Sequence, residues 1–192
     1  NKPSAQVKLS VISKYGCLSD TAKITVNRIP DFSLNVYDNK GCIPLETGFE
    51  GIINDPIDQL FFSWDYGDGT TGNGGYTTHF YHVADQKYNI TLTAMSALTQ
   101  CSDTLKIDTL VFVYPKPKAN FSVDHSIVYN DKPDIQFLNQ SSGAMKYSWD
   151  FGDGSTSIEE NPLHKYQSMG YHNALLQAYN DYNCMDTISY KV

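Results

Sequence analysis

The stretch Trp-Asp-Phe-Gly-Asp-Gly at residues 149–154 has a near-identical counterpart, Trp-Asp-Tyr-Gly-Asp-Gly, at residues 64–69. Each stretch is followed by a His-x-Tyr segment, at residues 164–166 and 79–81, and these segments lie as far apart as the two Trp residues. Self-similarity at a fixed period is the signature of repeated domains. The sequence therefore predicts two copies of one small domain, an organisation more typical of a surface scaffold than of an enzyme.

A third, partial copy is predicted at the start of the chain. Residues 7–21 resemble the last part of each full copy, at residues 88–104 and 171–187, and each of these segments contains a cysteine followed by Asp-Thr. An isolated two-stranded hairpin is marginally stable in water. We therefore expect residues 1–28 to dock on a partner, or to be the C-terminal hairpin of a preceding repeat whose remainder lies outside this chain.

The composition excludes several classes of function. The chain has 192 residues, with 14 Lys and Arg against 21 Asp and Glu and a net charge of −7. The few cations are scattered, so the sequence offers no electrostatic footprint for nucleic acid or for anionic membranes. No apolar run approaches the ~18 residues of a transmembrane helix, so direct membrane insertion is not expected.

Strand signals recur at short intervals, and helix signals are almost absent. Between Tyr88 and Ala94 the even-numbered positions are predicted to face a core and the odd-numbered ones to face solvent. The chain is therefore predicted to be all-β. The expected strands are residues 7–12, 22–26, 32–37, 45–49, 60–66, 88–94, 105–113, 119–123, 135–139, 146–151, 171–178 and 187–192.

Proline-bearing segments mark the predicted domain boundaries. Pro115 and Pro117 alternate with lysines between the two full copies, and Pro30 follows the N-terminal hairpin. Proline fixes φ and lacks a backbone donor, so short joints of this kind are extended and stiff. The sequence thus predicts a semi-rigid rod with domains at residues 1–28, 29–114 and 115–192.

The second copy resembles PKD (polycystic kidney disease) domains. It combines the Trp-Asp-Phe-Gly-Asp-Gly stretch with Asn-Pro-x-His-x-Tyr at residues 161–166 and Gly-Tyr at residues 170–171. The first copy departs from this pattern, because Thr77-Thr78 replaces Asn-Pro and no Gly precedes Tyr88. The resemblance covers about residues 30–192 and the opening hairpin, and it implies tandem seven-stranded, immunoglobulin-like β-sandwiches. The Gly-Cys-Ile-Pro-Leu and Cys-x-Asp-Thr additions resemble those of bacterial gliding-motility and type 9 secreted cell-surface proteins.

The residues of the repeated motif are expected to be structural. The Trp side chains should pack between two sheets, the glycines suit a turn with positive φ, and the second Asp can accept backbone N–H groups. The His is interpreted as a hydrogen-bonded structural imidazole, and ligand stacking by the Trp residues is the alternative. The motif set is Trp64, Asp65, Gly67, Asp68, Gly69, His79, Tyr81, Trp149, Asp150, Gly152, Asp153, Gly154, His164 and Tyr166.

Neither a cofactor nor a catalytic site is expected. Calcium at Asp65 and Asp68 is the alternative, but calcium takes about six to eight oxygen ligands from a loop that wraps it. The loop residues Asp55, Asp58 and Asp124 are acidic but lack motif support. A general base at His79 or His164 would need a nucleophile, and no Gly-x-Ser-x-Gly segment occurs. Glu159-Glu160 is interpreted as a solvated loop, because glycosidase carboxylates converge from separate strands.

The four cysteines are Cys17, Cys42, Cys101 and Cys184. They form no zinc-type spacing, and their dispersion indicates disulfides in an oxidising compartment. In a PKD-like topology, Cys17, Cys101 and Cys184 would lie in the last hairpin turn of their copies, with Cys42 before the second strand of the first full copy. A Cys42–Cys184 bridge and an intradomain Cys42–Cys101 bridge both remain open. The second is disfavoured because its two loops would lie at opposite ends of one sandwich.

The chain is interpreted as a non-catalytic extracellular or cell-surface module, a semi-rigid stalk segment of an adhesin-like protein. Its expected partners are neighbouring repeats of the same protein. The alternative is a glycan- or protein-binding module, ancillary to a secreted hydrolase, in which Tyr76, Tyr129 or Tyr182 stacks on a ligand. Exposed aromatic residues gathered on one sheet face would favour this alternative.

Overall fold

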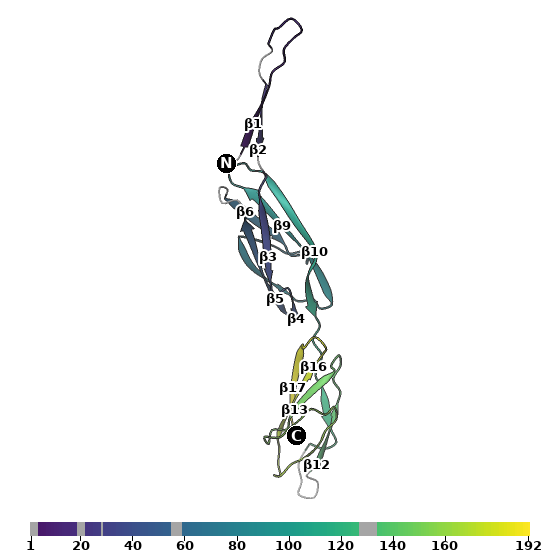
Figure 1. The fold of residues 1–192 in the computed structure, drawn as a ribbon. Helices are drawn as coiled ribbons and strands as arrows, with labels where there is room; N and C mark the ends of the chain where they lie inside the picture. Colours follow the sequence, from purple (N-terminus) through teal and green to yellow (C-terminus); the bar gives the residue numbers. More distant parts are fainter. Residues whose placement is uncertain (1–3, 19–21, 28, 55–58, 127–133) are drawn as a thin grey trace. The chain divides into compact units, whose positions relative to one another are not determined.

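The computed structural model describes residues 4–18, 22–27, 29–54, 59–126 and 134–192, and every regular element in them is a β-strand (Figure 1). The chain divides into two compact units. The first unit contains residues 1–39, 46–81 and 87–112, and the second contains residues 40–45, 82–86 and 113–192. The described residues include no helix that is long and apolar enough to cross a membrane.

The N-terminal hairpin of the first unit consists of β1 (Ser4–Leu9) and β2 (Ala22–Asn27), which pair antiparallel as a two-stranded sheet. The sequence predicted a first strand at residues 7–12, whereas β1 ends at Leu9 and Ile12 makes an isolated bridge to Leu18. The domain boundaries given above, residues 1–28, 29–114 and 115–192, stay predictions.

Two sheets are formed by the strands of the first full copy. One sheet has the order β3-β5-β8 and the other has the order β4-β10-β9-β6-β7. Aromatic rings pack between these sheets, since the ring centroid of Phe49 lies 5.5 Å from that of Trp64 and 5.2 Å from that of Tyr66. The strands are β3 (Phe32–Tyr37), β4 (Lys40–Cys42), β5 (Leu45–Ile53), β6 (Leu60–Asp65), β7 (Thr71–Asn73), β8 (Tyr76–Tyr81), β9 (Gln86–Ser96) and β10 (Ser102–Tyr114).

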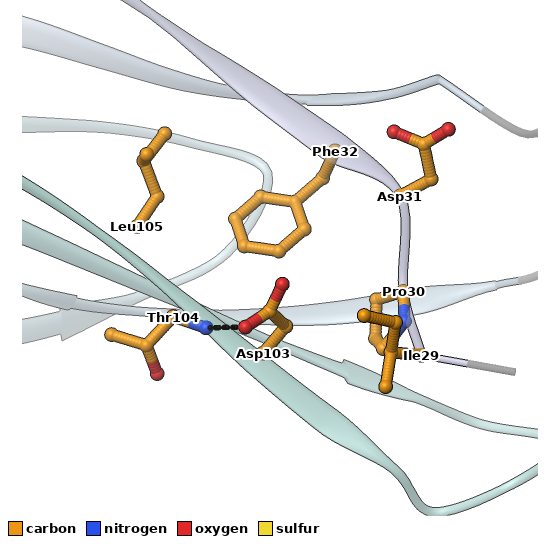
Figure 2. A pocket seen from close by; sticks show the side chains of 7 residues that line it. All are labelled: Ile29, Pro30, Asp31, Phe32, Asp103, Thr104 and Leu105. Atoms are coloured by element: carbon orange, nitrogen blue, oxygen red, sulfur yellow. Dashed lines mark hydrogen bonds between the residues drawn. The ribbon is translucent and has the colours of Figure 1, made fainter.

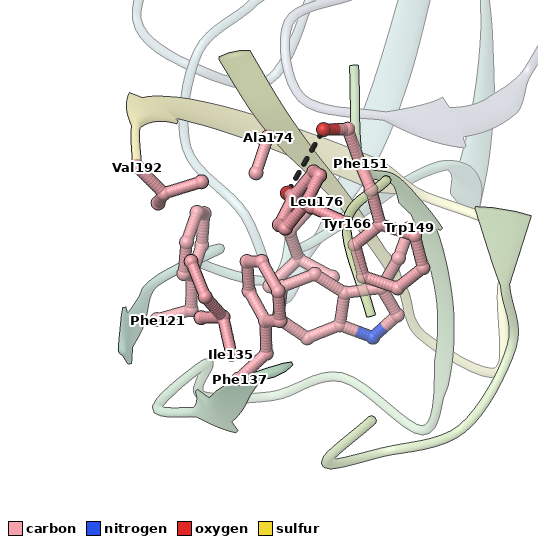
Figure 3. Close-up of a cluster of buried hydrophobic side chains, with 9 residues drawn as sticks. All are labelled: Phe121, Ile135, Phe137, Trp149, Phe151, Tyr166, Ala174, Leu176 and Val192. Atoms are coloured by element: carbon pink, nitrogen blue, oxygen red, sulfur yellow. Dashed lines mark hydrogen bonds between the residues drawn. The ribbon is translucent and has the colours of Figure 1, made fainter. Parts of the chain in front are cut away.

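The second copy forms the sheets β11-β12-β15 and β14-β13-β16-β17. Figure 3 shows its core, in which Trp149 lies beside the ring of Phe137 at a centroid distance of 5.4 Å and Phe121 packs edge-on at 5.1 Å. The strands are β11 (Phe121–Val123), β12 (Asp134–Asn139), β13 (Lys146–Asp150), β14 (Thr156–Ser157), β15 (Leu163–Lys165), β16 (Asn173–Tyr179) and β17 (Met185–Lys191).

Alternation along the strands explains why these residues form sandwiches. In β9 the side chains of Tyr88, Ile90, Leu92 and Ala94 are buried, as the even-numbered pattern predicted, and in β16 every second residue is buried. A strand with one apolar and one polar face needs a second sheet to cover the apolar face. The predicted fold class, all-β with immunoglobulin-like sandwiches, is confirmed.

Candidate functional site

The turn at the centre of each repeated motif is built in the same way in both copies. The carboxylate of Asp65 accepts the N–H of Gly67, and that of Asp150 accepts the N–H of Gly152, both at 2.9 Å. Gly67 and Gly152 have φ values of 78° and 77°, a region that favours glycine. A Cβ atom would lie 2.3 Å from the carbonyl oxygen of Asn89 at Gly67, and 2.5 Å from the nearest backbone oxygen at Gly152. The turn therefore requires glycine for its conformation and for its close packing.

A carboxylate–imidazole pair follows the turn in the first copy. His79 Nε2 lies 2.7 Å from Asp68 Oδ2, and the backbone N–H and the hydroxyl of Thr70 both donate to Asp68 Oδ1, at 3.0 Å and 2.6 Å. The His79 ring stacks on Tyr66 with a centroid distance of 4.2 Å and meets the edge of Tyr81 at 4.7 Å. The Tyr81 hydroxyl donates to the carbonyl oxygen of Tyr66 at 3.0 Å, so β8 is tied to the end of β6.

The second copy repeats this network. His164 Nε2 lies 2.8 Å from Asp153 Oδ2, and the backbone N–H and the hydroxyl of Ser155 donate to the other carboxylate oxygen. The His164 ring stacks on Phe151 at 4.0 Å, and the Tyr166 hydroxyl donates to the Phe151 carbonyl oxygen at 3.0 Å, the dashed line in Figure 3. We call this arrangement of Asp, His, hydroxyl and two aromatic side chains the Asp–His network.

The charges in the Asp–His network are fixed by its surroundings. Partial burial by itself raises the pKa of Asp153, but hydrogen bonds from the neighbouring hydroxyl and imidazole outweigh burial and lower this pKa to about 2. The pKa of Asp68 is lowered for the same reason: burial raises it, but hydrogen bonds from Thr70 and His79 outweigh burial. Burial raises the pKa of the hydroxyls of Tyr81 and Tyr166 far above the ordinary value. The carboxylates thus stay charged acceptors and the phenols stay donors near neutral pH.

The Asp–His network has the residue types of a hydrolytic triad but lacks its geometry. In a triad the imidazole uses one nitrogen for the nucleophile and the other for the carboxylate. Here the same atom, His164 Nε2, lies 3.2 Å from the Ser155 hydroxyl and 2.8 Å from Asp153. Because that hydroxyl already donates to the carboxylate, the imidazole has no proton to take from it. The arrangement binds a turn to a strand and activates no nucleophile.

Both Trp side chains are engaged in the core. Trp64 is 1% exposed and its indole N–H donates to the carbonyl oxygen of Gly74 at 2.9 Å. Trp149 is fully buried and donates to the carbonyl oxygen of Glu159 at 2.8 Å. A buried indole whose N–H is satisfied has no face available for stacking on a ligand.

Of the three acidic loop residues, the structure describes Asp124. Among the described residues, no three His, Cys, Asp or Glu side chains group in a way that could hold a metal ion. Asp55 and Asp58 lie outside the described residues. Asp124 accepts the backbone N–H groups of His125 and Gln136, both at 3.0 Å. Calcium binding by this chain remains a hypothesis.

One of the two cysteine pairings left open by the sequence is present. Cys42 and Cys184 form a disulfide with a Cα–Cα distance of 5.5 Å, and both belong to the second unit. In the same unit the N–H of Ile43 donates to the carbonyl oxygen of Tyr114, so hydrogen bonding also fixes the Cys42 segment. Cys17 is exposed, Cys101 is partly exposed, and both are free thiols.

The first unit has a hollow of about 430 Å³ that the sequence did not single out. Figure 2 shows the ring of Phe32 above the carboxylate of Asp103, which accepts the N–H of Thr104 at 2.8 Å, with Leu105 and Ile29 at the sides. The apolar side chains of the lining are those of Ile29, Pro30, Phe32 and Leu105, and its polar residues are Asp31, Asp103 and Thr104.

Exposed aromatic side chains occur in both units. Tyr76 is 62% exposed, and a Cβ atom at Gly48 would lie 3.1 Å from its hydroxyl and 3.5 Å from Tyr37 Cβ, so the two Tyr side chains flank this glycine. Tyr37, which the sequence did not indicate, donates to Glu50 at 2.5 Å. In the second unit, Tyr182 stacks on Tyr114 at 4.2 Å. Tyr129 lies outside the described residues.

Comparison with known proteins gives one family match. The model of the PKD domain matches residues 115–192, which therefore form a PKD domain. PKD domains are non-catalytic modules found in secreted bacterial proteins, and such a module can also be part of a larger enzyme.

Three solved structures are similar to this chain. The PKD1 domain of Vibrio anguillarum Epp is 25% identical over 40% of this chain and 90% of its own, with a TM-score of 0.36. The PKD1 domain of the Vibrio cholerae metalloprotease PrtV is 27% identical over 40% of this chain and 94% of its own, also with a TM-score of 0.36. Three N-terminal domains of the outer capsid protein Hoc of bacteriophage RB49 are 10% identical over 83% of this chain and 57% of their own, with a TM-score of 0.40.

Proposed function

We propose that this chain is a non-catalytic structural module, a semi-rigid stalk segment of an adhesin-like protein at the cell surface or outside the cell. Residues 29–114 serve as a second PKD-like domain beside residues 115–192, and the partners are neighbouring repeats of the same protein. The cysteine-bearing additions, Gly-Cys-Ile-Pro-Leu and Cys-x-Asp-Thr, support a parent of the gliding-motility and type 9 secreted kind.

The observation that carries this proposal is the duplicated Asp–His network. In both copies the carboxylate, the imidazole and the phenol are engaged with one another and with the backbone. A ligand site needs convergent polar groups that face an accessible hollow. The polar groups of these two equivalent networks are engaged in internal contacts, which favours a structural role for the motif.

The disulfide supports the stalk role. Cys42 belongs to the first sequence copy and Cys184 to the second, so the bridge covalently joins segments of different copies. A cross-link reduces the conformations open to the chain, which suits a spacer that must hold its shape. Disulfides also persist in oxidising, extracytoplasmic surroundings.

The stalk role is tested by equilibrium binding of the chain to a panel of bacterial and plant polysaccharides, once with calcium and once with a chelator. We expect no saturable binding in either buffer, with the β-sheet circular dichroism signal intact. Saturable binding at micromolar concentration would replace the stalk with a lectin-like module.

One observation favours that second function. Tyr37 and Tyr76 flank Gly48 on the sheet β3-β5-β8, with the Glu50 carboxylate beside them, and sugars stack on such aromatic faces. If polysaccharide binding is found, Tyr37→Ala and Tyr76→Ala identify this surface by abolishing it. Tyr171→Ala is the matched control, because Tyr171 is 56% exposed but belongs to the other unit.

A further inference from the structure

The N-terminal hairpin has the strand register of the last hairpin of the PKD domain. Val7 pairs with Ile24 and Leu9 with Ala22. In the last hairpin of the second copy, the corresponding pairs are Ala174 with Tyr190 and Leu176 with Ile188. In both hairpins an apolar residue of the first strand thus stands at each of these two positions.

The turns of the two hairpins match as well. The N–H of Ser13 donates to the Cys17 carbonyl oxygen at 2.9 Å, and that of Asn180 donates to the Cys184 carbonyl oxygen at 3.1 Å. In each turn the residue before the cysteine has a positive φ, 82° in the first and 58° in the last. Leu9 and Leu176 both stand four residues before the donor residue of their turn. The register and the turn together identify Leu9 as the counterpart of Leu176.

The two hairpins differ in what covers them. Ala174 and Leu176 are fully buried, whereas Val7 is 55% exposed and Leu9 is 62% exposed. A hairpin with large apolar side chains in water is at best marginally stable. In the described residues, the N-terminal hairpin therefore exposes residues whose counterparts face the core of a complete sandwich.

The complete copies show what lies beside the counterpart strand. Trp149 of β13 pairs directly opposite Leu176, and Trp64 of β6 pairs directly opposite Leu92 of β9. In the part of the chain that the structure describes, β1 pairs only with β2, so its other edge has no strand beside it. The open edge of β1 lies where a Trp strand lies in the two sandwiches.

We propose that the hairpin β1–β2 is the final part of a third sandwich, and that it binds the first-strand half of another PKD-like repeat. The Trp strand of that half pairs antiparallel with β1 and sets its Trp opposite Leu9. This proposal deepens the repeat-array function proposed above. A second copy of this chain fits the surface less well, because its own Trp strands already pair with β9 and β16.

The test is an extended chain in which a copy of residues 115–171 is placed directly before Ala5. This junction follows the register, since Val7 corresponds to Ala174. Amide hydrogen exchange of β1 and β2 is compared between the extended and the original chain. Burial within a cooperative sandwich is expected to slow this exchange by about 100-fold or more.

Two matched variants of the extended chain separate specific docking from mere crowding. Leu9→Asp places a charge opposite the Trp and is expected to return the exchange to that of the original chain. Lys8→Asp also adds an acid to β1, but the adjacent side chain points to the opposite face, so the protection is expected to remain.

A second extended chain guards against a junction that fails to fold. It places a copy of residues 30–87 before Ala5, with the Trp64 strand in place of the Trp149 strand. If the hairpin exchanges rapidly in both extended chains while the two original sandwiches stay folded, the proposal is wrong. It is equally wrong if sedimentation shows that the original chain dimerises with its hairpin protected. Neither result affects the stalk role of the two sandwiches, which the polysaccharide panel tests separately.

Discussion

Gly67 and Gly69 lie in the same turn, yet a side chain is expected to lower the free energy of unfolding by very different amounts at the two positions. Both have positive φ, at 78° and 88°. A Cβ atom at Gly69 meets nothing within 4 Å, whereas at Gly67 it lies 2.3 Å from a backbone oxygen of β9. Gly69→Ala should therefore cost about 1–2 kcal/mol of conformational strain. Gly67→Ala should cost at least about 3 kcal/mol, because overpacking adds to that strain.

The measurement for these two variants is urea unfolding, followed by the fluorescence change of the first unit. Each variant serves as the control for the other, since both replace a left-handed glycine with Ala. Equal losses of unfolding free energy would show that the turn does not pack against β9 in solution.

The Asp153 carboxylate makes the free energy of unfolding of the second unit dependent on pH. Its pKa in the folded state is about 2, below the ordinary value near 4. A lowered pKa means that the charged form stabilises the fold, so this contribution is complete above about pH 4. It is lost as the pH falls towards 2, and because solvent screens this partly exposed carboxylate it amounts to no more than about 1 kcal/mol.

Asp153→Asn tests this contribution. The variant should be less stable than the parent by about 1 kcal/mol at pH 7, and the difference should shrink as the pH falls towards 2. Urea midpoints between pH 2 and pH 7 measure it, with the exposed Asp181→Asn as control. A difference that does not change with pH would mean that the lost hydrogen bonds, and not the charge, stabilise the turn.

At the scale of elements, equivalent positions in two hairpins are expected to respond differently to the same substitution. Leu92 of β9 is fully buried, and Leu9 of β1 occupies the corresponding position but is 62% exposed. Leu92→Ala should lower the unfolding free energy by about 2–5 kcal/mol, because it opens a cavity in a packed core. Leu9→Ala should change it by no more than about 0.5 kcal/mol.

Urea unfolding of the two single variants, together with the double variant, decides between these expectations. A cost for Leu9→Ala that equals the cost for Leu92→Ala would indicate that the hairpin face is already covered in this chain. Additive costs in the double variant are expected, since the two positions lie in different sheets.

Most long strands were predictable from the sequence, although the six-residue β8 was missed, and of the strands with two or three residues only β11 was expected. Alternation over a strand such as β9 gives a clear period of two, so its buried face could be assigned residue by residue. The strands β7 and β14 have three and two residues, too few to show any period. Likewise β4 has only three residues, and its strand state depends on pairing with β10.

In the candidate site, too, local features could be predicted from the sequence and long-range contacts could not. Positive φ at Gly67 and burial of Trp64 are local consequences of the motif and could be expected from it. The contact between Asp68 and His79 joins a turn to a strand, so it depends on how β8 packs against the end of β6. The Tyr37 surface depends on the register of β3 against β5, in which Tyr37 pairs with Gly48, and no local pattern reveals it.

For the whole molecule, the sequence repeats and the compact units do not have the same boundaries. Residues 40–45 and 82–86 belong to the first sequence copy but group with the second unit. Near these segments, the N–H of Asp85 donates to the carbonyl oxygen of Val113, and Asn180 donates to that of Pro115 at 2.8 Å. The Cys42–Cys184 bridge thus reinforces a set of hydrogen bonds within the second unit.

Reduction of this bridge is expected to weaken the second unit specifically. The two cysteines are 142 residues apart, and the entropy of closing so long a loop corresponds to about 5 kcal/mol if the whole loop is unfolded. The first unit lies largely inside the loop and stays folded when only the second unit opens, so the flexible part of the loop is shorter. We therefore expect a loss of about 2–4 kcal/mol.

Unfolding of the double variant Cys42→Ser, Cys184→Ser measures this loss. The matched control is the double variant Cys17→Ser, Cys101→Ser, which removes the two free thiols and should leave the urea midpoint unchanged. Hydrogen exchange of β4 should quicken in the first variant only, because its segment then rests on hydrogen bonds such as that of Ile43 alone. If both double variants unfold like the parent, the bridge does not constrain the unfolded chain.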